Sequence, residues 1–395
     1  MTMTTRVLNT ASVSREELLG RASALVPALK ERAARAEQLR RIPPETVNDI
    51  VATGLLRVGN PDRFGGVGLD FDAILDVAAE LGRGCGSTAW CYSVWTVHNW
   101  AVGLWPEQGQ EEYFAESPDT FSSTSFNPAR SKVEATAGGY RLSGRWDFSS
   151  GCDEASWAML AGAGPNGVLW LLVPKGEFTI DDNWFVSGLR GTGSKEIVVD
   201  DVFIPAHRTA EHKLMLEGRS GGWEIHHRAS YRVPLNSPLG YTLSAPIVGM
   251  AQGAVEAFTE QLSDRTLVTG TRMAETVGCQ LRLAEASALV DATRLMMQRD
   301  GREMLERAER GAAASLLDRA RYKRDQAFVA RSCVQAIDQL FEASGGNALY
   351  ESNPLQRFQR DAHAASHHFA VRWDFMAEQY GRIALGLDPG PTARL

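Results

Sequence analysis

The sequence predicts an α+β protein of three domains: an N-terminal helical domain, a central small β-barrel and a C-terminal four-helix bundle. Three successive patterns along the 395 residues indicate this order. Apolar residues first recur at helical spacing, short β-branched and aromatic runs then alternate with glycine turns, and long amphipathic stretches follow. These patterns place the domains at residues 1–117, 118–220 and 221–395.

The first domain contains three stretches with helical character. Residues 15–38 carry apolar side chains at helical spacing, with Ala, Glu and Arg between them. Pro43 and Pro44 predict the start of a second, short helix. Residues 72–103 are apolar over most of their length, which is typical of helices that are buried on several sides.

The central domain has the pattern of a small β structure. Its short apolar runs are separated by turn residues, and Gly138-Gly139 and Pro165-Asn166-Gly167 stand where hairpin turns are expected. Six or more such runs occupy fewer than 100 residues, which favours a small barrel or sandwich.

The last domain is predicted to be an antiparallel bundle. Gly345-Gly346-Asn347 separate its last two helices, and the links between all of them are short. The four amphipathic stretches are residues 236–263, 270–301, 304–343 and 354–386.

Composition excludes several classes of protein. A net charge of -7 without a basic patch disfavours nucleic-acid binding. No apolar run reaches the ~20 residues that span a bilayer, and the first residues lack the apolar core of a signal peptide, so we expect a cytoplasmic protein without a membrane segment. The five cysteines are scattered and form no CxxC pair, which indicates neither a disulfide framework nor a zinc site.

Two motifs superficially resemble a metal site and a dinucleotide-binding loop. His363 and His367 are four positions apart on a predicted helix, but no HExxH glutamate or third ligand accompanies them, and we predict no metal site. Residues 82–87, GRGCGS, lie within a helical pattern and do not follow a strand, so the dinucleotide fingerprint is excluded. The chain is therefore expected to lack a site for NAD(P)H.

Three segments resemble characteristic segments of the acyl-CoA dehydrogenase superfamily, in matching order and spacing. Residues 188–205, GLRGTGSKEIVVDDVFIP, resemble the segment that closes its β domain, and residues 140–151, YRLSGRWDFSSG, resemble its flavin-facing hairpin. Residues 340–364, LFEASGGNALYESNPLQRFQRDAHA, resemble the Gly-Gly turn and Arg-Asp helix of its C-terminal domain. The resemblance covers most of the chain and implies an acyl-CoA dehydrogenase-like fold.

One branch of the superfamily is more similar: the oxygenase components of two-component hydroxylases that act on phenols, such as 4-hydroxyphenylacetate and steroid-derived phenols. The matching stretches are residues 86–100, 148–157 and 360–368. The resemblance implies that molecular oxygen hydroxylates a phenol-, indole- or polyketide-like substrate through a C4a-hydroperoxyflavin. It also implies a homotetramer and a separate NAD(P)H:flavin reductase that supplies reduced flavin, FADH2 in preference to FMNH2.

Two alternatives are a flavin-dependent acyl-CoA dehydrogenase or nitroalkane-type oxidase on the same scaffold, and a helical binding protein without catalysis. In the superfamily, the glutamate base of a dehydrogenase lies near the position of Phe369 or on an earlier helix that matches residues 239–253. Neither place holds a carboxylate here, and His368 stands beside Phe369. Because proton abstraction needs a base, the sequence favours the monooxygenase.

The resemblance also assigns roles to particular residues. His368 is predicted to be a base or hydrogen-bond partner for the substrate, His98 to orient the substrate, and Ser150 to hold flavin N5. Six aromatic residues are predicted to line a dry pocket: Trp90, Trp95, Trp100, Trp146, Trp157 and Phe148. Further predicted cofactor residues are Ser149 beside Ser150; Ser125 and Asn127 on a strand near the flavin pyrimidine; Thr192 and Ser194 near the isoalloxazine or phosphates; Arg272 or Arg265 at the diphosphate; and Gly345, Gly346 and Asn347 at a neighbouring subunit's flavin.

Overall fold

The computed structural model describes residues 13–266 and 270–390. Its N-terminal part consists of five α-helices. Ser14 caps the first helix by accepting the N–H of Glu17, and a proline opens the second. The predicted stretch 72–103 is two helices, because the chain turns where an added Cβ on Gly84 would lie 2.9 Å from the Val26 carbonyl oxygen. The helices are α1 (Arg15–Leu39), α2 (Pro44–Ala52), α3 (Phe71–Gly82), α4 (Gly86–Val102) and α5 (Glu107–Phe114).

The central barrel is built from two four-stranded sheets with the orders β1-β4-β5-β8 and β2-β3-β7-β6. The predicted glycine turns are confirmed, since they join the antiparallel pairs β2–β3 and β4–β5. Apolar side chains such as Leu142, Trp146, Leu160 and Ile197 form a small core of their own. The strands are β1 (Ser122–Ser125), β2 (Ser131–Thr136), β3 (Gly139–Ser149), β4 (Trp157–Gly164), β5 (Gly167–Pro174), β6 (Thr179–Asp181), β7 (Lys195–Pro205) and β8 (Thr209–Glu211).

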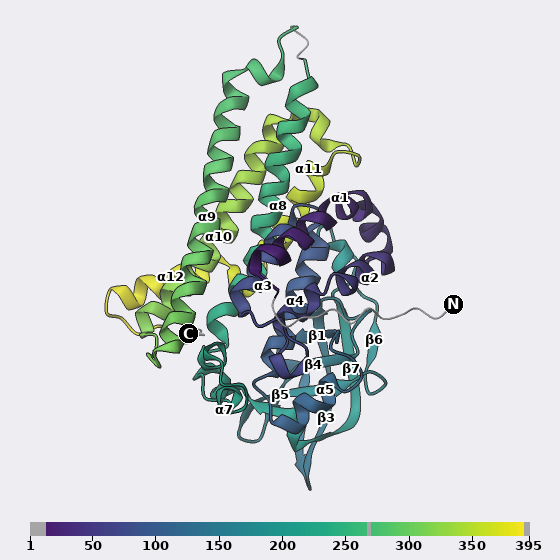
Figure 1. Ribbon diagram of the computed structural model, residues 1–395, viewed down its shortest axis with the longest axis vertical. Helices are drawn as coiled ribbons and strands as arrows, with labels where there is room; N and C mark the ends of the chain where they lie inside the picture. Colours follow the sequence, from purple (N-terminus) through teal and green to yellow (C-terminus); the bar gives the residue numbers. More distant parts are fainter. Residues whose placement is uncertain (1–12, 267–269, 391–395) are drawn as a thin grey trace.

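The C-terminal part contains the long helices of the bundle, which run side by side toward one end of the molecule (Figure 1). None of the described helices is both long and apolar enough to cross a bilayer. Two short helices, α6 (His212–Leu216) and α7 (Gly222–His226), precede α8 (Asn236–Asp264), α9 (Val277–Glu309), α10 (Leu316–Ala343), α11 (Pro354–Ser366) and α12 (Trp373–Ala384).

Two predicted helix boundaries in this part are wrong. The break expected between residues 301 and 304 is absent, because the buried Gly301 packs against Asp72 of α3 and α9 continues to Glu309. The break comes instead at Gly311, whose φ of 63° is left-handed. The last predicted helix is also interrupted, because the His368 side chain caps a short turn between α11 and α12.

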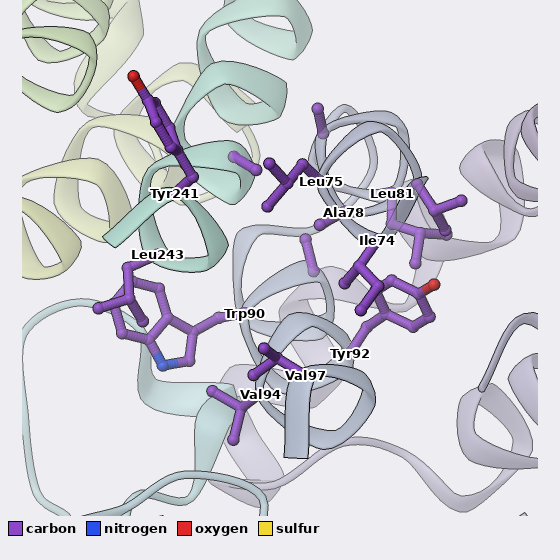
Figure 2. Packing of buried hydrophobic residues seen from close by; sticks show 14 of the residues in the cluster. Ile74, Leu75, Ala78, Leu81, Trp90, Tyr92, Val94, Val97, Tyr241 and Leu243 are labelled. Carbon is purple, nitrogen blue, oxygen red and sulfur yellow. The ribbon is translucent and has the colours of Figure 1, made fainter. Parts of the chain in front are cut away.

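Helix α4 connects the bundle to the sheets. It packs against α3 and α8 on one side, where Figure 2 shows the buried side chains, and against β1 on the other (Figure 1). Pro246 of α8 has no N–H, which leaves the Thr242 carbonyl without a helical partner, and Ser93 of α4 donates to that carbonyl at 2.5 Å. Every residue of α4 is buried. Side chains on this helix are therefore held rigidly between the two halves of the molecule.

Candidate active site

The end of strand β3 directs Ser150 toward α4. The register between β3 and β7 shifts between Trp146 and Ser149, and Phe148 adopts a left-handed φ of 65°. The Ser150 N–H then donates to the Phe148 carbonyl at 3.0 Å, which closes a tight turn. Ser149 and Ser150 are both buried, but only the Ser150 hydroxyl has a hydrogen-bond partner; the Ser149 hydroxyl has none among the described residues.

Gly151 is the residue that lets this turn approach α4. Its φ is 69°, and an added Cβ would lie 2.3 Å from Nε1 of the fully buried Trp95. We expect Gly151→Ala to lower the free energy of unfolding by about 2–4 kcal/mol in urea titrations, from backbone strain and overpacking together. Gly221→Ala is the matched control, because its φ is 78° but no atom lies within 4 Å of the added Cβ. Equal losses in the two variants would contradict the clash.

A chain of hydroxyl groups extends from Ser150 into the protein. Trp90 Nε1 of α4 donates to Ser150 Oγ at 3.0 Å, Ser150 Oγ lies 2.7 Å from Ser194 Oγ, and Ser194 Oγ lies 2.7 Å from Thr192 Oγ1. Thr192 Oγ1 donates to the Leu189 carbonyl at 2.8 Å. We call these five groups, from Trp90 to Leu189, the hydroxyl relay. The structure thus brings Ser150, Thr192 and Ser194 together, as residues of one predicted cofactor site.

His368 lies beside the first member of this relay. It occupies the turn between α11 and α12, and its ring meets the indole of Trp90 edge-on with centroids 6.1 Å apart. Its Nδ1 accepts the N–H of Ala370 at 3.2 Å. A neutral imidazole has one donor and one acceptor nitrogen, so the proton of neutral His368 is on Nε2. His368 Nε2 is therefore a hydrogen-bond donor.

His98 has the opposite tautomer. Its Nδ1 lies 2.9 Å from the carbonyl oxygen of Ser122 in β1, and because a carbonyl only accepts, Nδ1 carries the proton. Its Nε2 is consequently an acceptor. Neither Nε2 has a hydrogen-bond partner within the described chain. His98 lies eight positions after Trp90 on α4, which places it about 12 Å farther along the helix and about 80° around it.

Both histidines are held neutral. Burial lowers the pKa of His98 to about 4. Burial also lowers the pKa of His368 to about 4, and the positive charge of Lys323 in α10 adds to this effect. Lys323 is buried, its Nζ donates to the Asn236 carbonyl, and it forms no ion pair with a carboxylate of the described residues. The causes of the shift at His368 are its burial and the charge of Lys323, and no carboxylate of the described residues is among them.

Asp361 joins α11 to the relay. Its buried carboxylate Oδ1 accepts the N–H of Leu189 at 2.6 Å, and Leu189 has a left-handed φ of 52°. Burial raises the pKa of Asp361 to about 7. Gly188 permits this contact, since an added Cβ would lie 2.0 Å from the Arg360 carbonyl oxygen. The sequence gives no indication of this role for Asp361, because its partner Leu189 is 172 positions away.

The six aromatic side chains predicted to line a dry pocket lie in different parts of the molecule. Trp90 contacts His368, whereas Trp146 belongs to the core between the sheets and Trp95 packs on Phe121. Phe148 is 71% exposed, with its ring edge-on to Trp184. The six aromatic side chains therefore do not line one pocket. Five positions along a helix turn Trp95 about 140° away from Trp90, and the irregularity of β3 at Phe148, with its left-handed φ, turns that ring away from Trp146.

The other predicted cofactor residues form no hydrogen bond to the relay among the described residues. Ser125 is buried on β1 as expected, but Asn127 lies beyond the end of that strand, where its exposed side chain accepts the N–H of Ala129. Arg272 is exposed near the start of α9 and donates to the Ser263 carbonyl. Arg265 donates to the Ser344 carbonyl, next to the exposed Gly345, Gly346 and Asn347.

The Gly345–Asn347 turn, with Arg265 beside it, precedes the start of α11, whereas His368 follows the end of this helix. The 13 residues of α11 separate the Gly345–Asn347 turn from His368 by about 20 Å. Residues Gly345–Asn347 therefore cannot contact a small group bound at Ser150 of the same chain.

The two histidines that were considered as metal ligands form other hydrogen bonds. His363 Nε2 lies 2.9 Å from Asp338 Oδ1, and His367 Nδ1 donates to the His363 carbonyl at 2.6 Å. No cluster of three potential metal ligands occurs in the described part of the chain.

Comparison with known proteins identifies the class to which this fold and site belong. Residues 21–115 match the family model of the acyl-CoA dehydrogenase N-terminal domain, and residues 241–373 match that of the C-terminal domain. The crystal structure of 3-HSA hydroxylase from Rhodococcus sp. RHA1 superposes with a TM-score of 0.90 at 36% identity, covering 94% of this chain and 97% of that one. The fold is therefore that of the acyl-CoA dehydrogenases.

Proteins of similar sequence show which branch of the acyl-CoA dehydrogenase family contains this chain. The flavin-dependent monooxygenase, oxygenase subunit HsaA of Rhodococcus jostii is 37% identical over 93% of this chain and 98% of its own. The oxygenase component of the FADH(2)-dependent resorcinol hydroxylase of Rhizobium sp. is 34% identical over 94% and 95%. The chain belongs to the oxygenase-subunit family of flavin-dependent monooxygenases and is an oxidoreductase.

Proposed function

We propose that this protein hydroxylates an aromatic substrate with molecular oxygen and reduced flavin, and that a separate NAD(P)H:flavin reductase supplies the flavin. The observation that carries the proposal is a neutral histidine, His368, which contacts Trp90 of the relay and stands beside the position where the resemblance to dehydrogenases puts a glutamate. Reduced flavin, when bound, supplies the electrons that activate oxygen. The protein contributes positioning, exclusion of water and proton movement.

The residues divide this work between them. Ser150 holds flavin N5, with Trp90 and Ser194 fixing its hydroxyl. His98 Nε2 accepts a hydrogen bond from a substrate hydroxyl and so orients the ring, and His368 Nε2 donates a hydrogen bond to the oxygen that is being transferred or to the substrate oxygen. Thr192 and Ser194 support Ser150 instead of meeting the phosphates.

We propose FAD as the flavin and a homotetramer as the assembly. The resorcinol hydroxylase relative is named for FADH2, and the structure of XiaF from Streptomyces sp., at a TM-score of 0.90 and 27% identity, was obtained with FADH2. The turn at Gly345–Asn347 is separated from His368 by the length of α11, about 20 Å, and Arg272 donates to the Ser263 carbonyl at the end of α8. In the tetramer they would bind the diphosphate end of a neighbouring subunit's flavin.

The proposal is tested by supplying reduced flavin from a generic reductase. We expect mass spectrometry to find a product 16 mass units heavier than at least one substrate in a panel of phenols, indoles and naphthols. The gain of one oxygen atom is the signature of monooxygenation. The control contains the reductase and flavin without this protein.

The isolated protein, given FAD and NADH but no reductase, is expected to oxidise no NADH, because the chain has no dinucleotide fingerprint. NADH oxidation by the isolated protein would contradict the two-component arrangement. Absence of any oxygenated product from the whole panel would contradict aromatic hydroxylation.

A further inference from the structure

The hydroxyl relay has a fixed direction. Its inner end is the Leu189 carbonyl, which only accepts, and Thr192 Oγ1 donates to it at 2.8 Å. Each hydroxyl has a single hydrogen, so Ser194 must donate to Thr192, and Ser150 must donate to Ser194. At the outer end, the indole of Trp90 only donates, and it donates to Ser150. The Leu189 carbonyl therefore sets the direction of the relay, and the bond from Trp90 is compatible with it.

This direction leaves Ser150 as an acceptor. Its hydrogen is committed to Ser194 and one of its two lone pairs to Trp90. One lone pair remains, and only a donor can use it. Because Ser150, Ser194 and Thr192 are all buried, water is not available to rescue an outside group that meets the wrong partner.

Flavin N5 changes its hydrogen-bonding character with redox state. Reduced flavin carries a hydrogen on N5 and donates, whereas oxidised flavin has only a lone pair there and accepts. Resting on the proposed contact between Ser150 and N5, we infer that Thr192 and Asp361 are positioning residues that set the preference of this site for reduced over oxidised flavin, because they fix the direction of the relay.

Asp361 is the positioning residue at the inner end. Leu189 must stay in its left-handed conformation for its carbonyl to face Thr192, and the Asp361 carboxylate holds its N–H at 2.6 Å. The Leu189 carbonyl accepts a further bond from Trp184 Nε1 at 3.1 Å. These contacts fix the acceptor that sets the direction of the whole relay.

The test measures dissociation constants for FAD and for anaerobically reduced FAD, which requires no turnover. We expect the wild-type protein to bind reduced flavin about 10-fold or more tightly, the usual effect of one mismatched buried hydrogen bond. Thr192→Val frees the relay to reverse, so that Ser150 can donate to oxidised N5. We expect this ratio to fall to about 3-fold or less in Thr192→Val.

Asp361→Ala is expected to lower the ratio like Thr192→Val, and the double variant to lower it no further, because both act through Leu189. Asp361→Asn keeps an acceptor for the Leu189 N–H and should keep the ratio. Thr293→Val is the matched control, since Thr293 Oγ1 donates to the Leu289 carbonyl at 2.8 Å within α9 and has no part in the relay. Its melting temperature is expected to shift like that of Thr192→Val, with the ratio unchanged.

Ser150→Ala separates this inference from the proposed function. If Ser150→Ala binds reduced flavin as tightly as the wild type, Ser150 does not contact N5 and that part of the proposed function fails. If Ser150→Ala weakens reduced-flavin binding while Thr192→Val and Asp361→Ala keep the wild-type ratio, the relay does not set the selectivity and the inference alone is overturned.

Discussion

Replacing His368 by asparagine is expected to lower the rate of hydroxylation about 100-fold, the usual loss when a positioned acid or base is removed. Asparagine is a favoured N-cap residue, so its Oδ1 can keep the hydrogen bond from Ala370 N–H that His368 Nδ1 accepts at 3.2 Å. The variant therefore deletes the Nε2–H donor and leaves the turn intact. Product formed in a single turnover with prereduced flavin, quantified by mass spectrometry, measures the effect.

Two controls accompany this variant. Its dissociation constant for reduced flavin should stay within about 3-fold of wild type, because the flavin contact assigned to this site is Ser150. His368→Gln places an amide N–H near the position of Nε2 and should recover part of the rate. Wild-type hydroxylation by His368→Asn would show that the donor has no role.

The pH dependence has a sign that follows from burial. The pKa of His368 is lowered to about 4, so the side chain is neutral at every pH above that and charged only below it. A depressed histidine pKa means that protonation disfavours the folded site, so the neutral donor is present across the range from pH 5 to 8 and is lost as the pH falls toward 4. Hydroxylation should not titrate near the ordinary histidine pKa of about 6.5.

Replacing His98 by asparagine is expected to lower kcat/KM for the aromatic substrate roughly 10- to 100-fold, the effect of leaving a buried substrate hydroxyl without its acceptor. The Nδ2 of asparagine can take over the hydrogen bond that His98 Nδ1 donates to the Ser122 carbonyl at 2.9 Å. What is removed is the Nε2 lone pair. Steady-state rates over a range of substrate concentrations, with reduced flavin held constant, give the value.

The two histidine variants should differ in a second readout. His98→Asn acts on substrate binding, so its loss should appear mainly in KM, whereas His368→Asn should lower kcat. A substrate analogue in which the hydroxyl is methylated has no proton to give to Nε2 and should be used equally poorly by wild type and His98→Asn. If His98→Asn instead lost activity only through unfolding, melting temperature and activity would fall together.

Much of the fold followed from local pattern. The three-domain order, the glycine turns of the central domain and the Gly345–Asn347 break all depend on neighbours within a few residues, which the sequence displays directly. The helix break expected near residue 302 was wrong because Gly301 is stabilised by α3, more than 200 positions away. The interruption at His368 was missed because a histidine cap is a rare signal.

For the candidate site, the sequence also indicates the residue types but not their contacts. The residue types that suit oxygenation, with His368 beside the position where dehydrogenases carry a glutamate and Ser150 on a tight turn, could be chosen from the sequence and its resemblance. Their hydrogen bonds could not. The relay joins Trp90 on α4 to Ser150 and Ser194, and the three lie on segments more than 40 positions apart.

The order of amino acids establishes which groups are available: two histidines for proton chemistry, no carboxylate in residues 239–253, and serines at the end of the β3 hairpin. The role of each group depends on the folded structure. A histidine is a donor or an acceptor, and a serine accepts or donates, according to the partner that folding brings within about 3 Å. That partner is set by packing between distant segments, as with Ala370 at His368, the Ser122 carbonyl at His98 and the Leu189 carbonyl at the end of the relay.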